Sequence, residues 1–222
     1  MIGRVRWTTT AVLLLLALPW LVPVALGQQV DAGCPVDDAD IVIDPGHGGD
    51  DPGAQQETYA LDEAALNLEI AERVAELLRD EHLLAVALTR TDNGTTLGNS
   101  ERGDIANACG ADLFVMIHLN AAFDPEQDYT VTLWGEKTKD LAFSQVMLRS
   151  LASLGIPMAD SWQFDNGALL RARMPSVLVE GAFMTNEAEA MDLANGVRQQ
   201  WIAQAVVQGV VDWLELTGER AR

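Results

Sequence analysis

The chain has 222 residues, with 14 Lys and Arg against 33 Asp and Glu, and a formal net charge of −19. Nucleic-acid binding requires a basic surface that contacts phosphates, so this acidic balance excludes DNA or RNA as a partner. Hydrophobic residues make up 49% of the chain, which is enough to bury a core and excludes an intrinsically disordered protein. The length suits one domain.

The N-terminal segment has the pattern of a signal peptide. Arg4 and Arg6 precede an uncharged run over 7–30 that contains AVLLLLALPWLVPVAL, and the small residues Ala25 and Gly27 follow. This pattern predicts export and cleavage before Gln28. We expect a signal peptide over 1–27, an N-terminal lead-in over 28–39 and one folded domain over 40–222. The alternative is an uncleaved membrane anchor, since the apolar run is long enough to span a bilayer.

The two cysteines are consistent with export. An even count in a secreted chain permits one disulfide. Cys34 precedes the first expected strand and Cys109 precedes a later one, so both can lie at the same edge of a parallel sheet. A free Cys34 with a buried Cys109 is an equal alternative.

Short apolar runs alternate with longer segments of helical periodicity from Ala39 onward. The periodicity predicts strands over 41–44, 83–90, 113–118, 130–134 and 175–180, and helices over 62–80, 99–108, 139–153 and 197–216. Strands separated by helices of this length indicate βαβ units. The sequence therefore predicts an α/β fold, a mostly parallel central sheet with helices on both faces.

Two of the three histidines end predicted strands. His47 follows IVIDPG and His118 closes FVMIH, whereas His82 lies at a helix end and is expected on the surface. In open α/β sheets, ligands bind beyond the carboxyl ends of the strands. We therefore expect His47 and His118 to meet at a binding site.

Two carboxylates occupy related positions. Glu63 begins the first helix, and with His47 and His118 it completes a two-His, one-Glu donor set typical of catalytic zinc, which leaves a fourth position for water. The alternative is that Glu63 only complements the charge of the helix N-terminus. Glu180 ends the apolar run PSVLV. An ionised group there is costly unless it is paired, solvated or used, and a carboxylate near zinc can act as a general base.

Six motifs together resemble a known family. The strings IVIDPGHGGDDPGA, Glu63 with Asn67-Leu68 following, LTRTD, LGNSERGDIAN, ADLFVMIHLN and PSVLVEGAFMTN are similar, in order, to the motifs of the type-3 family of zinc-dependent N-acetylmuramoyl-L-alanine amidases. The resemblance covers roughly residues 40–215, so that 40–222 is expected to be the amidase catalytic domain.

The resemblance implies hydrolysis of the amide between the lactyl group of N-acetylmuramic acid and the L-alanine of the peptide stem. It implies Zn²⁺ as cofactor, His47, Glu63 and His118 as its ligands, and Glu180 as the catalytic carboxylate. Two positions depart from the family pattern: Ala64 replaces the usual Lys, and Met116 replaces a small Ser. Neither change removes a ligand, although Met116 can reshape the pocket floor.

Three further residues are weaker candidates. Asp44 and Asn120 flank the histidines and are expected to supply hydrogen bonds that fix the imidazole tautomers, although an Asp at such a junction is as often a turn former. Arg171 resembles a family position that faces the cleft and would contact carboxylates of the peptide. Its alternative is an exposed Arg that balances the acidic surface.

The sequence thus predicts a secreted zinc amidase of peptidoglycan, acting in the periplasm or cell wall as a monomer. The alternatives are a zinc peptidase acting on stem peptides and a non-catalytic peptidoglycan-binding protein. Some family members carry an inserted helix that covers the metal until a partner removes it. Only residues 121–130 separate the His118 motif from the next strand, which is too short for such a helix, so we expect an open cleft and no activator.

Overall fold

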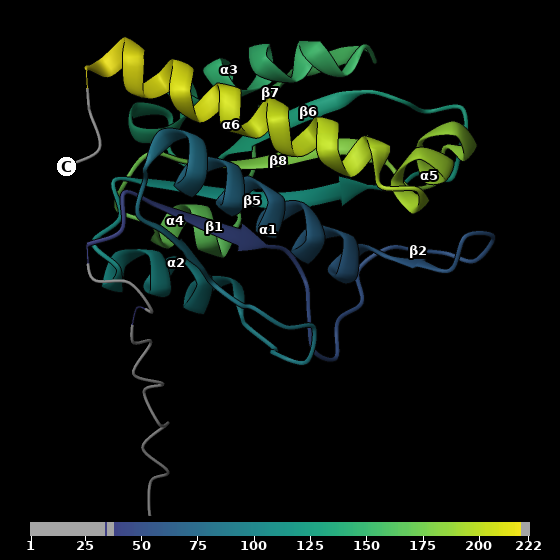
Figure 1. The fold of residues 1–222 in the computed structure, drawn as a ribbon, viewed down its shortest axis with the longest axis horizontal. Helices are drawn as coiled ribbons and strands as arrows, with labels where there is room; N and C mark the ends of the chain where they lie inside the picture. The colour runs from purple at the N-terminus through teal and green to yellow at the C-terminus, as the bar shows by residue number, and fades with distance from the viewer. Residues whose placement is uncertain (1–33, 35–37, 219–222) are drawn as a thin grey trace, which may run out of the picture. The chain divides into compact units, whose positions relative to one another are not determined.

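The computed structural model describes residue 34 and residues 38–218 (Figure 1). The predicted signal peptide and most of the lead-in fall outside these residues. The strands are β1 (Ile41–Pro45), β2 (Gln55–Gln56), β3 (Leu61–Asp62), β4 (Val86–Leu88), β5 (Leu113–Asn120), β6 (Thr130–Trp134), β7 (Met158–Gln163) and β8 (Ser176–Phe183). The helices are α1 (Glu63–His82), α2 (Asn99–Ala108), α3 (Lys137–Leu151), the 3₁₀ turn η1 (Ala152–Leu154), α4 (Gly167–Arg171), α5 (Glu187–Ala194) and α6 (Val197–Thr217).

Six strands form one sheet in the order β4-β1-β5-β8-β6-β7. The pairs β1–β4, β1–β5 and β5–β8 are parallel, β6 runs antiparallel to β8, and β7 is parallel to β6. β2 and β3 form a separate two-stranded hairpin. The predicted mostly parallel sheet is confirmed.

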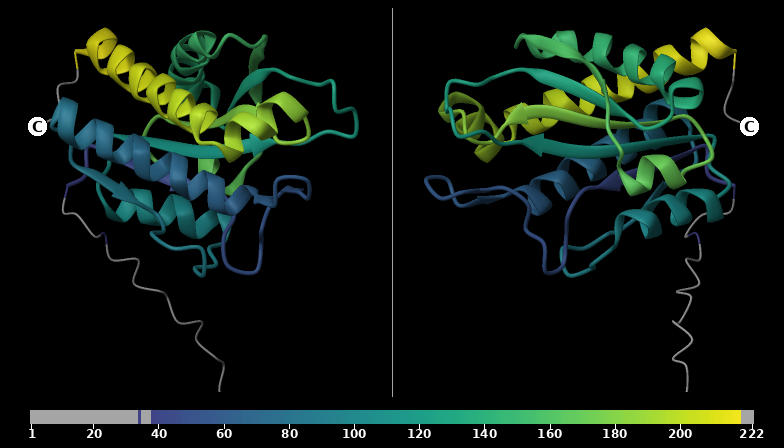
Figure 2. Two further views of the ribbon diagram at one scale, coloured as in Figure 1. Left: turned by 45° about the vertical axis from the view of Figure 1, so that its right-hand side comes forward. Right: turned by 180° about the vertical axis from the view of Figure 1, so that it is seen from behind.

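Helices cover both faces of this sheet, as predicted (Figure 2). α1, α3 and α6 share one hydrophobic core with the odd-numbered residues of β1 and β5, while α2 and α4 share a second core with the even-numbered ones. The central strands are apolar on both sides because each side is covered. Consecutive residues of β5 therefore point into different cores, which fixes the face on which His118 lies.

The predicted strand over 83–90 is shorter in the structure. α1 ends at His82. Leu83 follows as its C-cap, with a left-handed φ of 59° and an N–H that donates to the carbonyl oxygen of Leu78, and only Val86–Leu88 pair as β4. Leu83 is 84% exposed. Leu83 and Leu84 are apolar, but they belong to the end of α1 and to the connection that follows it. An apolar run of this kind cannot be distinguished from the start of a strand by periodicity alone.

Several short elements were not predicted: the β2–β3 hairpin, β7, α4 and α5. β7 is an edge strand whose residues are mostly exposed, so it lacks the apolar alternation that marks a strand. The other predicted elements agree with the structure to within about three residues at each end, a normal uncertainty for boundaries.

Cys34 and Cys109 form a disulfide, with their Cα atoms 4.8 Å apart. Of the two alternatives for the cysteines, a disulfide or a free Cys34, the structure has the disulfide. Ala39, five residues after Cys34, donates its N–H to the carbonyl of Cys109, so the bridge joins the chain entering β1 to the end of α2. Within the described residues, no helix is long and apolar enough to cross a membrane.

Candidate active site

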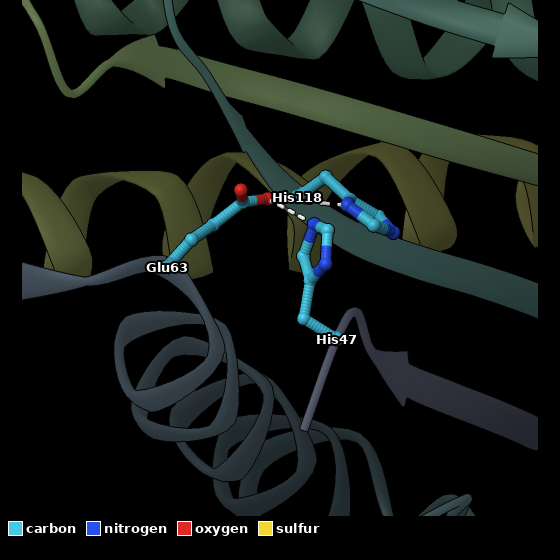
Figure 3. Close-up of side chains that lie close together, drawn as sticks. All are labelled: His47, Glu63 and His118. Carbon is cyan, nitrogen blue, oxygen red and sulfur yellow. Dashed lines mark hydrogen bonds and ion pairs between the residues drawn. The ribbon is translucent and has the colours of Figure 1, made fainter. Parts of the chain in front are cut away.

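His47, Glu63 and His118 meet at the carboxyl-terminal edge of the sheet (Figure 3). His47 lies in the loop after β1, Glu63 is the first residue of α1, and His118 lies near the end of β5. Each offers one nitrogen or oxygen atom, and these three atoms lie within 4.8 Å of one another. The predicted donor set is therefore assembled by the fold, because β1 and β5 are parallel neighbours whose ends coincide.

The Glu63 carboxylate lies between the two imidazoles. Its Oε1 is 3.1 Å from Nε2 of His47 and 3.2 Å from Nδ1 of His118. The same Oε1 accepts the N–H of Leu119, and Oε2 accepts the N–H of Ala54 at 2.9 Å. The Glu63 side chain is thus fixed by backbone donors on two sides, which is more than charge complementation of a helix end requires.

The charges of the cluster shift one another's pKa values. Burial acts to raise the pKa of Glu63, but hydrogen bonds from His118 and His47 hold it well below its usual range. The hydrogen bond to Glu63 raises the pKa of His47 to about 9, against the effect of burial and with help from Asp51. In the absence of a cation, the Glu63 carboxylate therefore favours the protonated form of His47, and a metal ion would compete with that proton.

Asp51 orients His47, a role that was not predicted from the sequence. Its Oδ2 lies 2.8 Å from Nδ1 of His47, which leaves Nε2 directed at Glu63. A carboxylate on the far nitrogen fixes the tautomer and orientation of a ligating imidazole. The feature of the sequence that could have indicated this role is the position of Asp51, an acidic residue four positions after His47.

Asp44 does not contact either imidazole, so its predicted role is corrected. It is fully buried in β1 and accepts hydrogen bonds from Thr89 and from Nη1 of Arg102, the latter at 2.8 Å. Nη2 of Arg102 donates to the carbonyl oxygen of His47 at 2.7 Å. Asp44 therefore acts on the His47 loop through Arg102, because its side chain points under α2 rather than out of the sheet edge.

A second buried arginine holds the same loop. Arg90 donates to the carbonyl oxygens of Pro45, Gly46 and Ala64 at 2.8–3.0 Å. Asn67 adds weaker hydrogen bonds to Gly46 and to Glu63. Arg90 and Arg102 belong to the motifs LTRTD and SERGD, but their partners are distant in sequence and were not predictable from spacing.

The glycine before His47 is required by a close approach. A Cβ atom on Gly46 would lie 2.3 Å from the ring of His118, so any larger residue would displace that imidazole. His47 itself has a φ of 60° and Gly48 a φ of 115°. The tight loop therefore depends on glycines for the backbone path and for room beside His118.

Glu180 lies beside this cluster. In the parallel β5–β8 pair it is the register partner of His118, and both side chains lie on the face covered further down by α2 and α4. Its Oε2 is buried without a hydrogen-bond partner among the described residues. Burial, reinforced by the charge of Glu63 and opposed by His47, raises the pKa of Glu180 to about 8. A carboxyl group with such a pKa can exchange a proton near neutral pH.

The fold does not bring two other candidates into the cluster. The Oδ1 of Asn120 accepts the N–H of Ala121, and Arg171 forms an ion pair with Asp104 of α2, at 2.5 Å. The Arg171 side chain is 58% exposed, as its surface alternative predicted. Met116 is buried in the core beneath α2 rather than lining the cluster. His82 is exposed at the end of α1, as expected.

Fold and site together define an α/β protein with a candidate metal centre at the carboxyl-terminal edge of its sheet. Residues 41–212 match the family model described as N-acetylmuramoyl-L-alanine amidase. The chain belongs to this family, whose members act on peptidoglycan, and it is a hydrolase.

Relatives agree with this assignment. The chain is 37% identical over 184 residues to the N-acetylmuramoyl-L-alanine amidase LytC of Bacillus subtilis (strain 168), an alignment that covers 81% of this chain but only 36% of LytC. A crystal structure of an N-acetylmuramoyl-L-alanine amidase from Clostridium difficile 630 superposes with a TM-score of 0.75 at 30% identity, covering 81% of this chain and 98% of that one. The catalytic domain of CwlV from Bacillus (Paenibacillus) polymyxa var. colistinus gives 0.74 at 29% identity, with 79% and 97% covered.

Proposed function

We propose that the protein is a secreted, zinc-dependent amidase that cleaves the bond between N-acetylmuramic acid and L-alanine in peptidoglycan. The observation that carries this proposal is the cluster of His47, Glu63 and His118 with Glu180 as the register neighbour of His118. Family membership supplies the substrate class. A protein that only binds peptidoglycan has no need of a buried carboxylate without a hydrogen-bond partner beside such a donor set.

The donor set fits zinc. Two imidazole nitrogens and one carboxylate oxygen are the ligands of many catalytic zinc sites, and Gly46 leaves the room that the His118 ring needs. We assign His47, Glu63 and His118 as the ligands. When bound, zinc supplies Lewis-acid chemistry that polarises an amide carbonyl and makes water a stronger nucleophile.

Glu180 is the proposed proton carrier. As a carboxylate it takes a proton from the attacking water while the water oxygen bonds to the carbonyl carbon of the lactyl group. It then gives that proton to the nitrogen of L-alanine as the carbon–nitrogen bond breaks. The products are a free lactyl carboxyl group and a peptide stem with a free amine. The buried, unpartnered Oε2 leaves Glu180 free to hold the proton between the two steps.

The loop contacts explain how the ligands stay in place. Asp51 fixes the ring of His47, Arg102 holds the backbone carbonyl of His47, and Arg90 holds the carbonyls of Pro45 and Gly46 just before it. Such preorganisation lets a site bind its metal and substrate without reordering the loop.

Export is supported by two observations. The N-terminal residues 1–27 have a signal-peptide pattern, and the Cys34–Cys109 disulfide is typical of an oxidising compartment. We therefore propose action in the periplasm or cell wall, with residues 40–222 as the catalytic domain.

Product analysis by mass spectrometry tests the proposal. Purified peptidoglycan treated with the zinc-loaded protein should release intact peptide stems and leave intact glycan strands. Shortened stems would identify a peptidase instead. A folded, zinc-loaded preparation that releases nothing would identify a binding protein.

A further inference from the structure

Trp162 is a large aromatic side chain left exposed on the edge strand β7. It is 45% exposed, and Phe164, directly after the strand, is 46% exposed. Exposed apolar groups that gather on one surface mark binding sites more often than isolated ones do. β7 has no role in the proposed chemistry, so its exposed aromatic residues call for another explanation.

Trp162 lies on the same face of the sheet as Glu180. The hydroxyl of the preceding Ser161 contacts Ser144 of α3, and consecutive residues of a strand point to opposite faces, so Trp162 faces away from α3. Leu178 is buried in the core beneath α2 and α4. Glu180, two residues further along β8, shares that face.

The strand register places Trp162 close to the catalytic carboxylate. Val131 of β6 pairs with Glu180, and Leu133 of β6 pairs with Trp162. With strands about 4.8 Å apart and a rise of about 3.3 Å per residue, the Cα atoms of Glu180 and Trp162 lie roughly 12 Å apart. A short run of linked sugars would span this distance.

A neighbouring aromatic residue holds Trp162 in position. The ring of Tyr129, just before β6, makes an edge contact with Trp162 at 6.3 Å between centroids. Tyr129 also packs against the buried Phe183 at the end of β8, at 4.7 Å. Contacts of this type fix ring orientation. Trp162 is therefore connected, through Tyr129, to the core that carries Glu180.

The local charge favours an uncharged ligand. Residues 158–165 contain two exposed carboxylates, Asp160 and Asp165, and no Lys or Arg. Peptide stems carry carboxylates of their own and would be repelled here. The glycan strand is neutral where the lactyl group is bound in an amide, and the apolar face of a sugar ring packs well on an exposed indole.

We propose that Trp162, oriented by Tyr129, is a stacking platform for a sugar of the glycan strand next to the muramoyl residue that is cleaved. This inference rests on the proposed function, since it places the glycan across β6 from Glu180. β7 would then recognise the glycan strand, and other parts of the site would bind the peptide stem.

Trp162→Ala is the test, with Trp201→Ala as the matched control. Trp201 is 46% exposed but lies on α6, which covers the opposite face. Kinetics are measured on soluble peptidoglycan fragments of several sugars and on muramoyl dipeptide, which has one sugar. Trp162→Ala should raise KM for the fragments about tenfold, the equivalent of one good aromatic contact, with kcat unchanged. KM for muramoyl dipeptide should not change, and Trp162→Phe should restore most of the affinity.

Binding of tetra-N-acetylchitotetraose, measured by NMR titration, separates the platform from the chemistry. The wild type and Trp201→Ala should bind this probe, and Trp162→Ala should bind it about tenfold more weakly. The inference is overturned if the two Ala variants bind the probe alike or if no Trp162-dependent binding is seen. It is also overturned if Trp162→Ala raises KM for muramoyl dipeptide as much as KM for the longer fragments. Trp162-dependent binding without amide cleavage would refute the proposed function but support the platform.

Discussion

At His47, two charged side chains act on different atoms of one residue. Asp51 binds the ring, and Arg102 binds the backbone carbonyl while pairing with the buried Asp44. The ring and the loop are thus held independently. Substitutions around His47 can therefore affect metal affinity and folding stability separately.

We expect His118→Ala to abolish both bound zinc and hydrolysis, because a catalytic zinc site needs three protein ligands and only two would remain. Zinc content measured by mass spectrometry, together with amidase activity, checks this. His82→Ala is the control: His82 is exposed at the end of α1, so its loss should leave both values unchanged. Stoichiometric zinc with normal activity in His118→Ala would refute the ligand assignment.

Glu180→Ala should retain zinc and lose about two or more orders of magnitude in kcat, as removal of a general base does. A base acts when deprotonated, so wild-type kcat/KM should fall as the pH drops through the pKa of Glu180. That pKa is about 8 without metal, and the charge of bound zinc would lower it. The variant should lack this acidic limb. Loss of zinc instead would make Glu180 a fourth ligand.

The Asp44–Arg102 pair should be important for stability. Arg102→Met leaves the fully buried Asp44 carboxylate without its counter-charge, at a cost of about 3–5 kcal/mol in the free energy of unfolding. Urea unfolding measures this. The double variant Asp44→Asn, Arg102→Met should be less destabilised than Arg102→Met alone.

Arg171→Met provides the comparison, since its pair with Asp104 is largely exposed and screened by solvent, and its loss should change the free energy of unfolding little. Equal losses for Arg102→Met and Arg171→Met would show that the buried pair has no special role.

At the scale of elements, the disulfide and the active site lie at opposite edges of the sheet. Cys109 precedes β5, whereas His118 lies near the end of that strand. The bridge closes a segment with a sequence separation of 75 residues, which contributes about 4 kcal/mol in the chain-entropy model.

Replacing both cysteines by Ser should therefore lower the free energy of unfolding by about this amount and leave kcat unchanged in the folded protein. Denaturant unfolding and steady-state kinetics measure the two quantities. An unchanged midpoint, or a large loss of kcat below the transition, would contradict the separation of stability from activity.

At the scale of the whole molecule, the segment that follows the His118 strand bears on regulation. Residues 121–129 form no helix, and β6 begins at Thr130 as predicted. α3 packs against β6, β8 and α6 as an ordinary sheet-covering helix. Residues 121–129 thus contain no helix that could cover the cluster between β5 and β6.

We therefore predict that residues 28–222, loaded with zinc, cleave purified peptidoglycan without an added protein. Release of stems measured by mass spectrometry over time checks this, with Glu180→Ala as the inactive control. A folded, zinc-loaded preparation that becomes active only when a second protein is added would refute it.

Sequence by itself determined the fold class and the four residues at the centre of the site. In the sequence, His47 follows an apolar run, His118 and Glu180 close apolar runs, and Glu63 begins a periodic helix. Local pattern thus places all four near the ends of elements, and a parallel sheet brings such ends together. The tertiary structure decided what supports them. Arg102 pairs with Asp44 across 58 residues of sequence, so no spacing rule could connect the two. The exposed edge strand β7, which carries Trp162, lacked the apolar alternation that sequence patterns detect, because only its pairing with β6 makes it a strand.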